Sequence, residues 1–416
     1  MQMKIINKEF ILAFFFALYT LNISAGSTGS QFETPAARDS VSAFIRSLQY
    51  TSGSAAGAFK KSQSPAYRVG GTGAEMFFVE PYFTHIACMA LLEEGGPENI
   101  AAVEGWMNWY IGKVGENPNS CPDAPLMMNY FYDAAGGSET TSAAEMGDAF
   151  SCTIDAEDSD PALFFMLAYR YFKATDNDAW FQETGVRGKL ESFVNFLYDE
   201  LYDSATGLTS AKRTWPLKYT MDNSEVYAGM KAFVGIMDDV YGETASSEVA
   251  RATTMMNTTQ TNIISLKMYP SGTPTSYNDF KLFGSTDCCD GYLDGQRMYD
   301  FTPILWPVLF GIDTDFDSDA ANYIRDLINE TMQGWNQPAW YMNAAAGGFW
   351  DNSVGYFFSM SADSTYQEAG KAQAVNAVNE SFKSDSMGAE SFISDAGWLL
   401  LNLQAMAGEG VELYNY

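Results

Sequence analysis

The chain has 416 residues, of which 47% are hydrophobic and 15% aromatic, and this composition is ample for a large globular core and excludes a disordered protein. Its formal net charge is −29, so its surface repels phosphate backbones and we expect no nucleic acid among its partners. The single histidine and five cysteines leave few ligands for a zinc site, and glycine loops of the Walker type are absent. We therefore expect no metal and no cofactor.

The first residues predict an export signal. Residues 10–21, FILAFFFALYTL, are apolar, follow Lys4 and Lys8, and precede a small-residue site ending at Ala25. Because the run is short for a membrane span, a cleaved signal peptide over 1–25 is favoured over an uncleaved anchor. We expect a flexible Ser/Gly-rich leader over 26–34, a single domain over 35–416, no membrane contact after cleavage, and a secreted or periplasmic location.

The remainder predicts a nearly all-α protein, because no segment shows sustained period-two alternation. Glycine and proline at Gly95, Gly96 and Pro97 mark a short turn between the first two paired helices. Other turns alternate between short and long, so about twelve helices in hairpins predict a toroid of two concentric rings. Helices are expected near 36–50, 78–93, 97–112, 160–173, 178–201, 214–241, 246–266, 303–311, 316–334, 340–346, 364–380 and 391–406, with a short apolar piece at 349–360.

The most apolar of these helices follows an acidic run. Residues 153–181 read TIDAEDSDPALFFMLAYRYFKATDNDAWF. Asp160 and Pro161 fit an N-cap and a first helical position, and the apolar residues around most of the circumference indicate a buried helix. Carboxylates at one end of a buried helix are candidates for acid/base chemistry. The alternative is that Asp160 only caps the helix and that Asp158 only flanks it.

A second cluster combines Asp222, Asn223 and Glu225. Asp222 as N-cap with Glu225 three residues later has the spacing of a capping box, which is the purely structural interpretation. The preceding Trp215, Lys218 and Tyr219 add aromatic rings and a cation at the same helix start, which favours contact with a substrate.

Four segments carry a resemblance to a known superfamily: FVEPYFTHIACMALLE, EDSDPALFFMLAYRYFKATDNDAWF, KYTMDNSEVYAGM and LWPVLFGI. They resemble the six-hairpin glycosidases, which are (α/α)6 barrels, and especially an uncharacterised bacterial branch. The resemblance covers most of residues 75–405. The segment around Asp158 and Asp160 also resembles the Asp-x-Asp segment of family 8 glycoside hydrolases. Their catalytic glutamate motif near the first hairpin has no convincing match here, although Glu75 and Glu80 lie in the right region.

This resemblance implies a glycoside hydrolase acting on a poly- or oligosaccharide. We expect a neutral glycan in preference to an acidic one, because the chain is itself strongly negative. Asp222 or Glu225 would act as general acid and Asp158 or Asp160 as base, or the reverse, and separated carboxylates favour inversion. A polysaccharide lyase on the same toroid and a non-catalytic glycan-binding protein are the alternatives. The expected substrate-binding residues are Tyr82, Trp215, Lys218, Tyr219, Asn223, Tyr227, Asp300 and Trp306.

One further acidic pattern, Asp313, Asp315, Asp317 and Asp319, alternates like a calcium loop. The loop has no glycine at its sixth position, and its twelfth position is Ile324, where a calcium loop of this type carries a glutamate. The pattern therefore favours a solvated turn that caps the next helix.

Overall fold

The structure, a computed structural model, describes residues 34–69, 73–116, 126, 128–140, 154, 156–266, 269–276, 279, 302–337, 349–381, 392–410 and 412–416. Residues 34–416 form one compact unit. The expected signal peptide and most of the leader, the helix near 340–346, and Asp300 lie outside the described residues.

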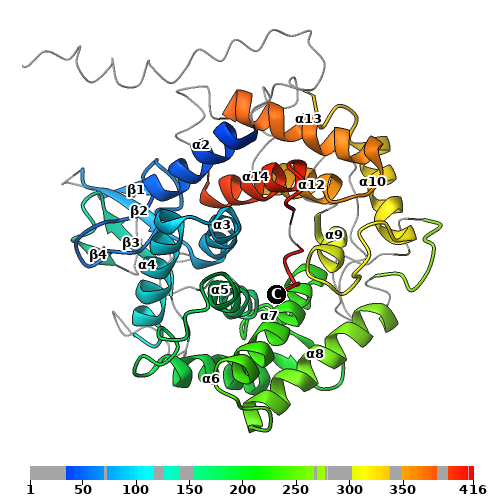
Figure 1. Cartoon of the computed structure of the whole chain (residues 1–416). Coiled ribbons are helices and arrows are strands. Elements are labelled where there is room, and N and C mark those ends of the chain that lie inside the picture. The colour runs from blue at the N-terminus through cyan, green and yellow to red at the C-terminus, as the bar shows by residue number, and fades with distance from the viewer. Residues whose placement is uncertain are drawn as a thin grey trace, which may run out of the picture. The chain divides into compact units, whose positions relative to one another are not determined.

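The described helices form two concentric rings (Figure 1). In the inner ring each helix contacts the next and the last contacts the first. The inner helices are α3 (Pro81–Glu94), α5 (Ser159–Thr175), α7 (Thr220–Asp239), α9 (Thr302–Leu309), α12 (Phe349–Ser359) and α14 (Ile393–Met406). The outer helices are α2 (Thr34–Ser47), α4 (Pro97–Lys113), α6 (Val186–Phe196), α8 (Ser247–Ser265), α10 (Asp319–Thr331) and α13 (Ser364–Ser381). The expected (α/α)6 toroid is confirmed.

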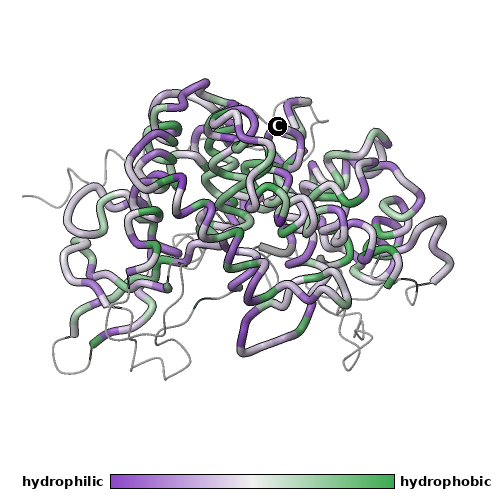
Figure 2. Tube along the Cα trace, turned by 90° about the horizontal axis from the view of Figure 1, so that it is seen from below, coloured by the Kyte–Doolittle hydropathy of each residue, from purple (hydrophilic) through white to green (hydrophobic). Residues whose placement is uncertain are grey.

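Outer and inner helices alternate along the chain, so the inner helices all run in the same direction. Apolar residues concentrate in the central helices, as the tube in Figure 2 shows in green. α5 and α7 approach until their backbones touch, since a Cβ added at Gly229 of α7 would lie 2.5 Å from the carbonyl oxygen of Ala162 in α5. Within the described residues, no helix combines the length and apolarity needed to cross a membrane.

Short strands occupy the connections that lead into the inner helices. β1 (Tyr67–Arg68), β2 (Glu75–Val79), β3 (Tyr130–Asp133) and β4 (Glu139–Thr140) form an antiparallel sheet in that order, and β5 (Tyr202–Asp203) pairs with β6 (Leu208–Thr209). β2 is buried along nearly its whole length, so it lacks the alternation by which a half-buried strand is recognised in a sequence. β2 directly precedes α3, and β6 lies beside the start of α7.

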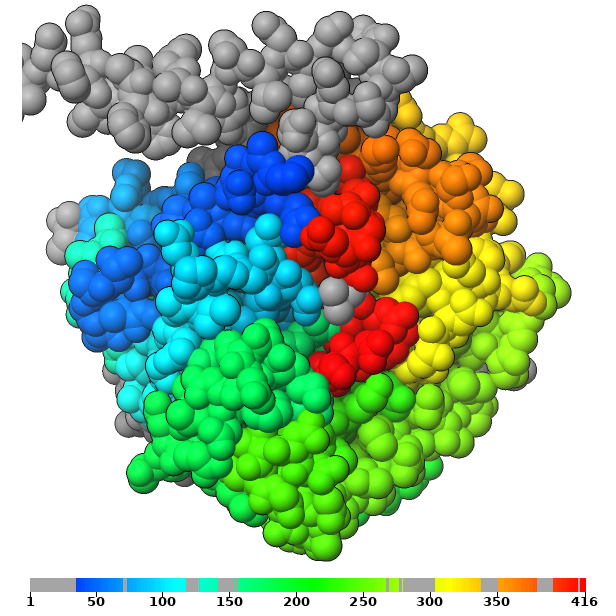
Figure 3. All heavy atoms as spheres, in the orientation of Figure 1, coloured from blue at the N-terminus to red at the C-terminus, as the bar shows by residue number. Residues whose placement is uncertain are grey.

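Residues 412–416 close the centre of the ring where the inner helices end. Arg170 of α5 donates hydrogen bonds to the carbonyl oxygens of Leu413 (3.2 Å) and Glu412 (2.6 Å), and Lys231 of α7 donates to that of Tyr414 (3.2 Å). In the space-filling view this final segment fills the middle of the face shown (Figure 3).

Several boundaries differ from those expected. α5 begins at Ser159 with Asp158 as its N-cap, not with Asp160, because the Asp158 carboxylate accepts from Ser159 N at 2.9 Å. α7 begins at Thr220 after Tyr219, so Asp222 is not an N-cap. The helix expected over 178–201 begins only at Val186 and ends in a π-helical turn over Leu197–Leu201. The apolar piece near 349–360 is the inner helix α12.

Candidate active site

Buried and partly buried carboxyl groups gather at the end of the ring where the inner helices begin. Each of five inner helices carries at least one acidic residue within two turns of its start, or just before it. Because these helices are parallel neighbours in a closed ring, the side chains converge although they are far apart in sequence. The residues are Glu80 before α3, Asp158 and Asp160 at α5, Asp222 and Glu225 in α7, Asp351 in α12 and Asp395 in α14.

Glu225 points into the ring and is completely buried. Its Oε1 accepts a hydrogen bond of 2.6 Å from the Tyr82 hydroxyl of α3 and one of 2.7 Å from Trp306 Nε1 of α9. α3 is not a ring neighbour of α7, so Tyr82 reaches across the interior to make this contact. Burial raises the pKa of Glu225 to about 7, while hydrogen bonds from Ser159, Tyr82 and Trp306 oppose that rise. Glu225 is therefore an acid that exchanges its proton near neutral pH.

Asp158 is the second completely buried carboxyl group. Its Oδ1 accepts from Ser159 N at 2.9 Å and its Oδ2 accepts from the Thr209 hydroxyl of β6 at 2.9 Å. Burial raises the pKa of Asp158 to about 7 against these hydrogen bonds, and the charge of Glu157 adds to the rise. Asp158 thus combines the N-cap role, which the sequence had assigned to Asp160, with the perturbed acidity of a functional group.

The two groups influence each other. The negative charge of Asp158 contributes to the raised pKa of Glu225, as expected for two carboxyls brought together in a site of low dielectric. Since the pKa of each group is raised to about 7, one group can hold a proton while the other is ionised near neutral pH. This is the state that acid/base catalysis by two carboxyl groups requires.

Asp160 belongs to a different network. Its Oδ1 lies 3.1 Å from His85 Nε2 and its Oδ2 accepts from the Tyr110 hydroxyl at 3.2 Å. Trp106 donates to His85 Nδ1 at 3.2 Å, so the neutral imidazole carries its proton on Nε2 and donates it to Asp160. This buried chain joins α3, α4 and α5 and fits a structural role for Asp160 and His85.

Of the α7 residues near Glu225, Asn223 binds the β5–β6 hairpin, and Asp222 and Tyr227 are buried. Asn223 is buried and accepts from Thr209 N at 2.8 Å while donating to Thr209 O at 3.1 Å. It thereby holds the threonine whose hydroxyl binds Asp158. Asp222 is 5% exposed and lies one turn before Glu225. Tyr227 is buried in the same helix, and burial raises its pKa.

Some of the remaining expected substrate-binding residues are exposed to solvent, and the others already contact protein groups. Trp215 is 52% exposed and donates its indole N–H to the Tyr219 hydroxyl at 2.8 Å. Lys218 forms an ion pair of 3.3 Å with Asp203 of β5. The open face of Trp215 can stack on a sugar ring. Tyr82 and Trp306 contact Glu225 instead of facing solvent.

A third group of acids lies on the other side of α3, and of its members sequence reasoning named only Glu80. Burial raises the pKa of Asp395 to about 7. A hydrogen bond from Phe392 N and the charge of Lys61 oppose this rise, and the charge of Asp351 adds to it. Lys61 also forms an ion pair of 2.5 Å with Glu80. Asp395 lies three residues after Phe392, the N-cap of α14. Because phenylalanine is not a usual N-cap residue, the sequence offers no capping signal there.

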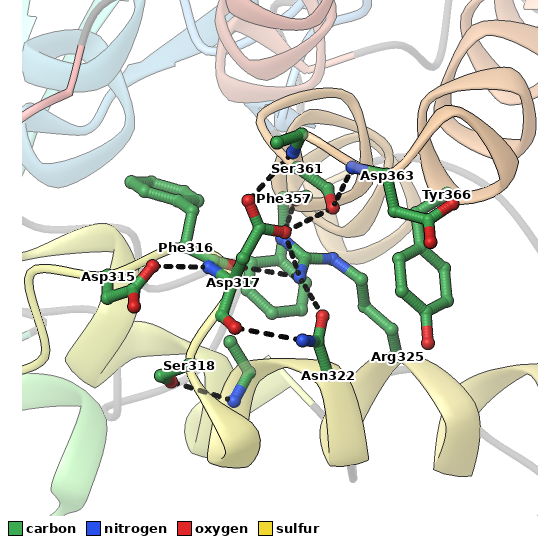
Figure 4. A network of polar contacts seen from close by, with 12 residues as sticks. Asp315, Phe316, Asp317, Ser318, Asn322, Arg325, Phe357, Ser361, Asp363 and Tyr366 are labelled. Atoms are coloured by element: carbon green, nitrogen blue, oxygen red, sulfur yellow. Dashed lines mark hydrogen bonds and ion pairs between the residues drawn. The ribbon is translucent and has the colours of Figure 1, made fainter.

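The aspartates between α9 and α10 bind protein groups (Figure 4). Asp317 accepts from the Ser361 hydroxyl and from Ala362 N, and lies 3.6 Å from the buried Arg325. Ser318 caps α10. Across the ranges that the structure describes, no group of three or more His, Cys, Asp or Glu side chains is arranged to hold a metal ion.

Comparisons with known proteins establish the fold. The chain matches no known family model, and no curated protein matches its sequence. Three solved structures share the toroid: a glycosidase variant in complex with glucose (TM-score 0.58, 10% identity, 92% of this chain and 100% of that one), a β-1,3-1,4-glucanase from Paenibacillus sp. X4 (0.56, 12%, 93% and 95%), and a D-mannose isomerase (0.50, 12%, 92% and 100%).

This chain therefore shares the α/α toroid fold of these solved structures, which is the fold that the sequence predicted. Because an isomerase shares the same toroid, the reaction has to be argued from the side chains at the site.

Proposed function

We propose that the chain is a glycoside hydrolase that cleaves a neutral poly- or oligosaccharide, with Glu225 as general acid and Asp158 as general base. The observation that carries this proposal is the pair itself. Two completely buried carboxyl groups from adjacent inner helices each have a pKa of about 7. A glycosidase needs one protonated and one ionised carboxyl group around the scissile bond.

The proposed reaction uses each group once. Glu225 gives its proton to the glycosidic oxygen as the bond between that oxygen and the anomeric carbon breaks. Ionised Asp158 takes a proton from a water molecule whose oxygen forms the new bond to the anomeric carbon from the opposite face. The products are two shorter glycans with inverted configuration at the new reducing end.

Both carboxyl groups are shielded from solvent in this structure. The proposal therefore requires that a bound glycan opens this end of the ring, after which exclusion of water would strengthen the electrostatic effects on the reaction. Trp215 supports the choice of substrate, because its exposed ring lies just before α7 and sugar faces stack on such rings. The net charge of −29 disfavours anionic glycans.

Export of the enzyme is part of the proposal. It rests on the apolar run at 10–21 after two lysines, which is typical of a secretory signal, and it would bring the enzyme to extracellular or periplasmic polysaccharides. Mass spectrometry of the mature protein would test the cleavage near Ala25, and an intact amino terminus in the exported protein would contradict it.

The direct test measures reducing ends released from neutral glucans, xylans and mannans by the wild type, Glu225→Gln and Asp158→Asn. We expect each variant to lose about 10²- to 10⁴-fold in kcat while staying folded. Glu183→Gln, which changes an exposed glutamate, is the matched control and should keep full activity.

Other outcomes would identify another function. Unsaturated products from uronate-containing glycans would indicate a lyase, and interconversion of free aldoses and ketoses would indicate an isomerase. Glycan binding without turnover would indicate a binding protein. Full activity of both Glu225→Gln and Asp158→Asn would remove the assigned pair from the mechanism.

A further inference from the structure

The two oxygens of Glu225 have unequal surroundings. Oε1 receives two donors, the Tyr82 hydroxyl at 2.6 Å and Trp306 Nε1 at 2.7 Å. An indole nitrogen can only donate, so Trp306 fixes Oε1 as an acceptor. A carboxyl oxygen with two lone pairs is saturated when two such donors bind it. Oε1 is therefore poorly suited to carry the acidic proton.

Oε2 has the opposite environment. It is buried and makes no hydrogen bond of ordinary geometry, and the nearby Ser159 hydroxyl interacts with the carboxyl group closely enough to oppose the rise that burial causes in the pKa of Glu225. An ionised Oε2 in this place would have the Ser159 hydroxyl as its donor, against the two donors that Oε1 receives, and negative charge is costly in a buried site. A protonated Oε2 places a neutral hydroxyl there instead.

We propose that Tyr82 and Trp306 are positioning residues that saturate Oε1 of Glu225 and so fix its acidic proton on Oε2. The inference rests on the proposed function in one respect, namely that the Oε2 proton is the one given to the glycosidic oxygen. When the Oε2–H bond breaks, its electron pair remains on the carboxylate, and the two donors at Oε1 stabilise the new charge. Tyr82 and Trp306 thus orient the acid and also stabilise its conjugate base.

The test follows the ionisation of Glu225 by NMR of protein labelled with ¹³C at the glutamate carboxyl, with the Glu225→Gln variant assigning the signal. Because hydrogen bonds to the ionised form lower a pKa, Tyr82→Phe and Trp306→Phe should each raise the pKa of Glu225, by about 1 unit. Tyr110→Phe is the matched control, since Tyr110 donates to Asp160, and it should leave the Glu225 signal unchanged.

In a cleavage assay, Tyr82→Phe should lower kcat by about tenfold with little change in KM, and should move the alkaline limb of the pH profile upward by the same shift as the NMR titration. Circular dichroism identifies the variants that stay folded. If Trp306→Phe does not fold, Tyr82→Phe still provides the test, because it retains the buried aromatic ring and removes only the hydroxyl.

The outcomes separate the two proposals. An unchanged or lowered pKa of Glu225 in folded Tyr82→Phe overturns the positioning role, even if the protein cleaves glycans. Raised pKa values in a protein that cleaves none would support the proton placement and reject the hydrolase.

Discussion

The Tyr82 hydroxyl lies 2.6 Å from Glu225 Oε1 although the two residues are 143 positions apart in the chain. This contact spans the interior of the ring between α3 and α7, which are not neighbours. It shows that the first turn of α3 and the second turn of α7 face a common space. The acids, the aromatic donors and the hairpin that carries Thr209 are brought together there.

The stability of the fold should depend on the ionisation of Glu225. The pKa of Glu225 is raised from 4.5 to about 7, so the folded protein binds more protons than the unfolded chain between these values. Its contribution to stability is full below pH 4.5 and is lost as pH rises through about 7. Over this interval we expect the free energy of unfolding to fall by up to about 3 kcal/mol because of Glu225, and Tm should fall with it. Thermal melts of wild type and Glu225→Gln from pH 4 to 8 should show a shallower decline in the variant, and parallel curves would contradict the assignment.

Asp160 should matter for folding more than for chemistry. In Asp160→Asn an amide group would face the donors His85 and Tyr110, so a buried hydrogen bond would be lost. We expect destabilisation by about 2 to 4 kcal/mol, measured as the urea midpoint. Asp238→Asn alters an exposed residue of α7 and should change that midpoint little. Unaltered stability of Asp160→Asn with loss of kcat would instead return Asp160 to the catalytic pair.

The final segment should be essential to the ring. A Cβ at Gly311, where φ is 78°, would lie 2.4 Å from Cγ of Tyr414. Gly311→Ala should therefore lower Tm through both the clash and the left-handed backbone. Combining it with Tyr414→Ala should produce less destabilisation than the sum of the single changes. Strict additivity in this cycle would mean that the contact does not determine the packing of residues 412–416.

Trp215 should contribute to binding without contributing to stability. It is 52% exposed, so Trp215→Ala removes little buried area. Loss of a stacked sugar ring should raise KM by about tenfold with kcat nearly unchanged. Leu266→Ala changes a leucine that is 38% exposed and should leave KM unaltered. A fall in kcat alone would assign Trp215 to the chemical step.

Much of the fold could be predicted because its signals are local. Gly95, Gly96 and Pro97 mark the α3–α4 turn, and the apolar circumference of α5 identifies a buried helix. α12 was harder, because the helix Phe349–Ser359 is short and its residues 351–359 are all buried, so it shows no amphipathic period. The strands of the first sheet were missed for a similar reason, since β2 is buried without alternation.

The site could be predicted only as a set of candidates. The acidic run before α5 and the pair in α7 include Asp158 and Glu225, but sequence spacing does not reveal which carboxyl turns toward His85. That choice depends on α4, whose Trp106 and Tyr110 complete the Asp160 network. The bond from Trp306 to Glu225 likewise depends on how the ring closes.

The common direction of the inner helices has an electrical consequence. Each helix carries roughly half a positive charge at its start and half a negative charge at its end, so the parallel inner helices direct their positive ends toward the site, while the outer helices run the opposite way. The carboxyl groups of Asp158 and Glu225 lie toward the positive end, while Arg170 and Lys231 bind carbonyl oxygens toward the negative end. A chain as acidic as this one can therefore hold ionisable acids inside its ring by means of its backbone.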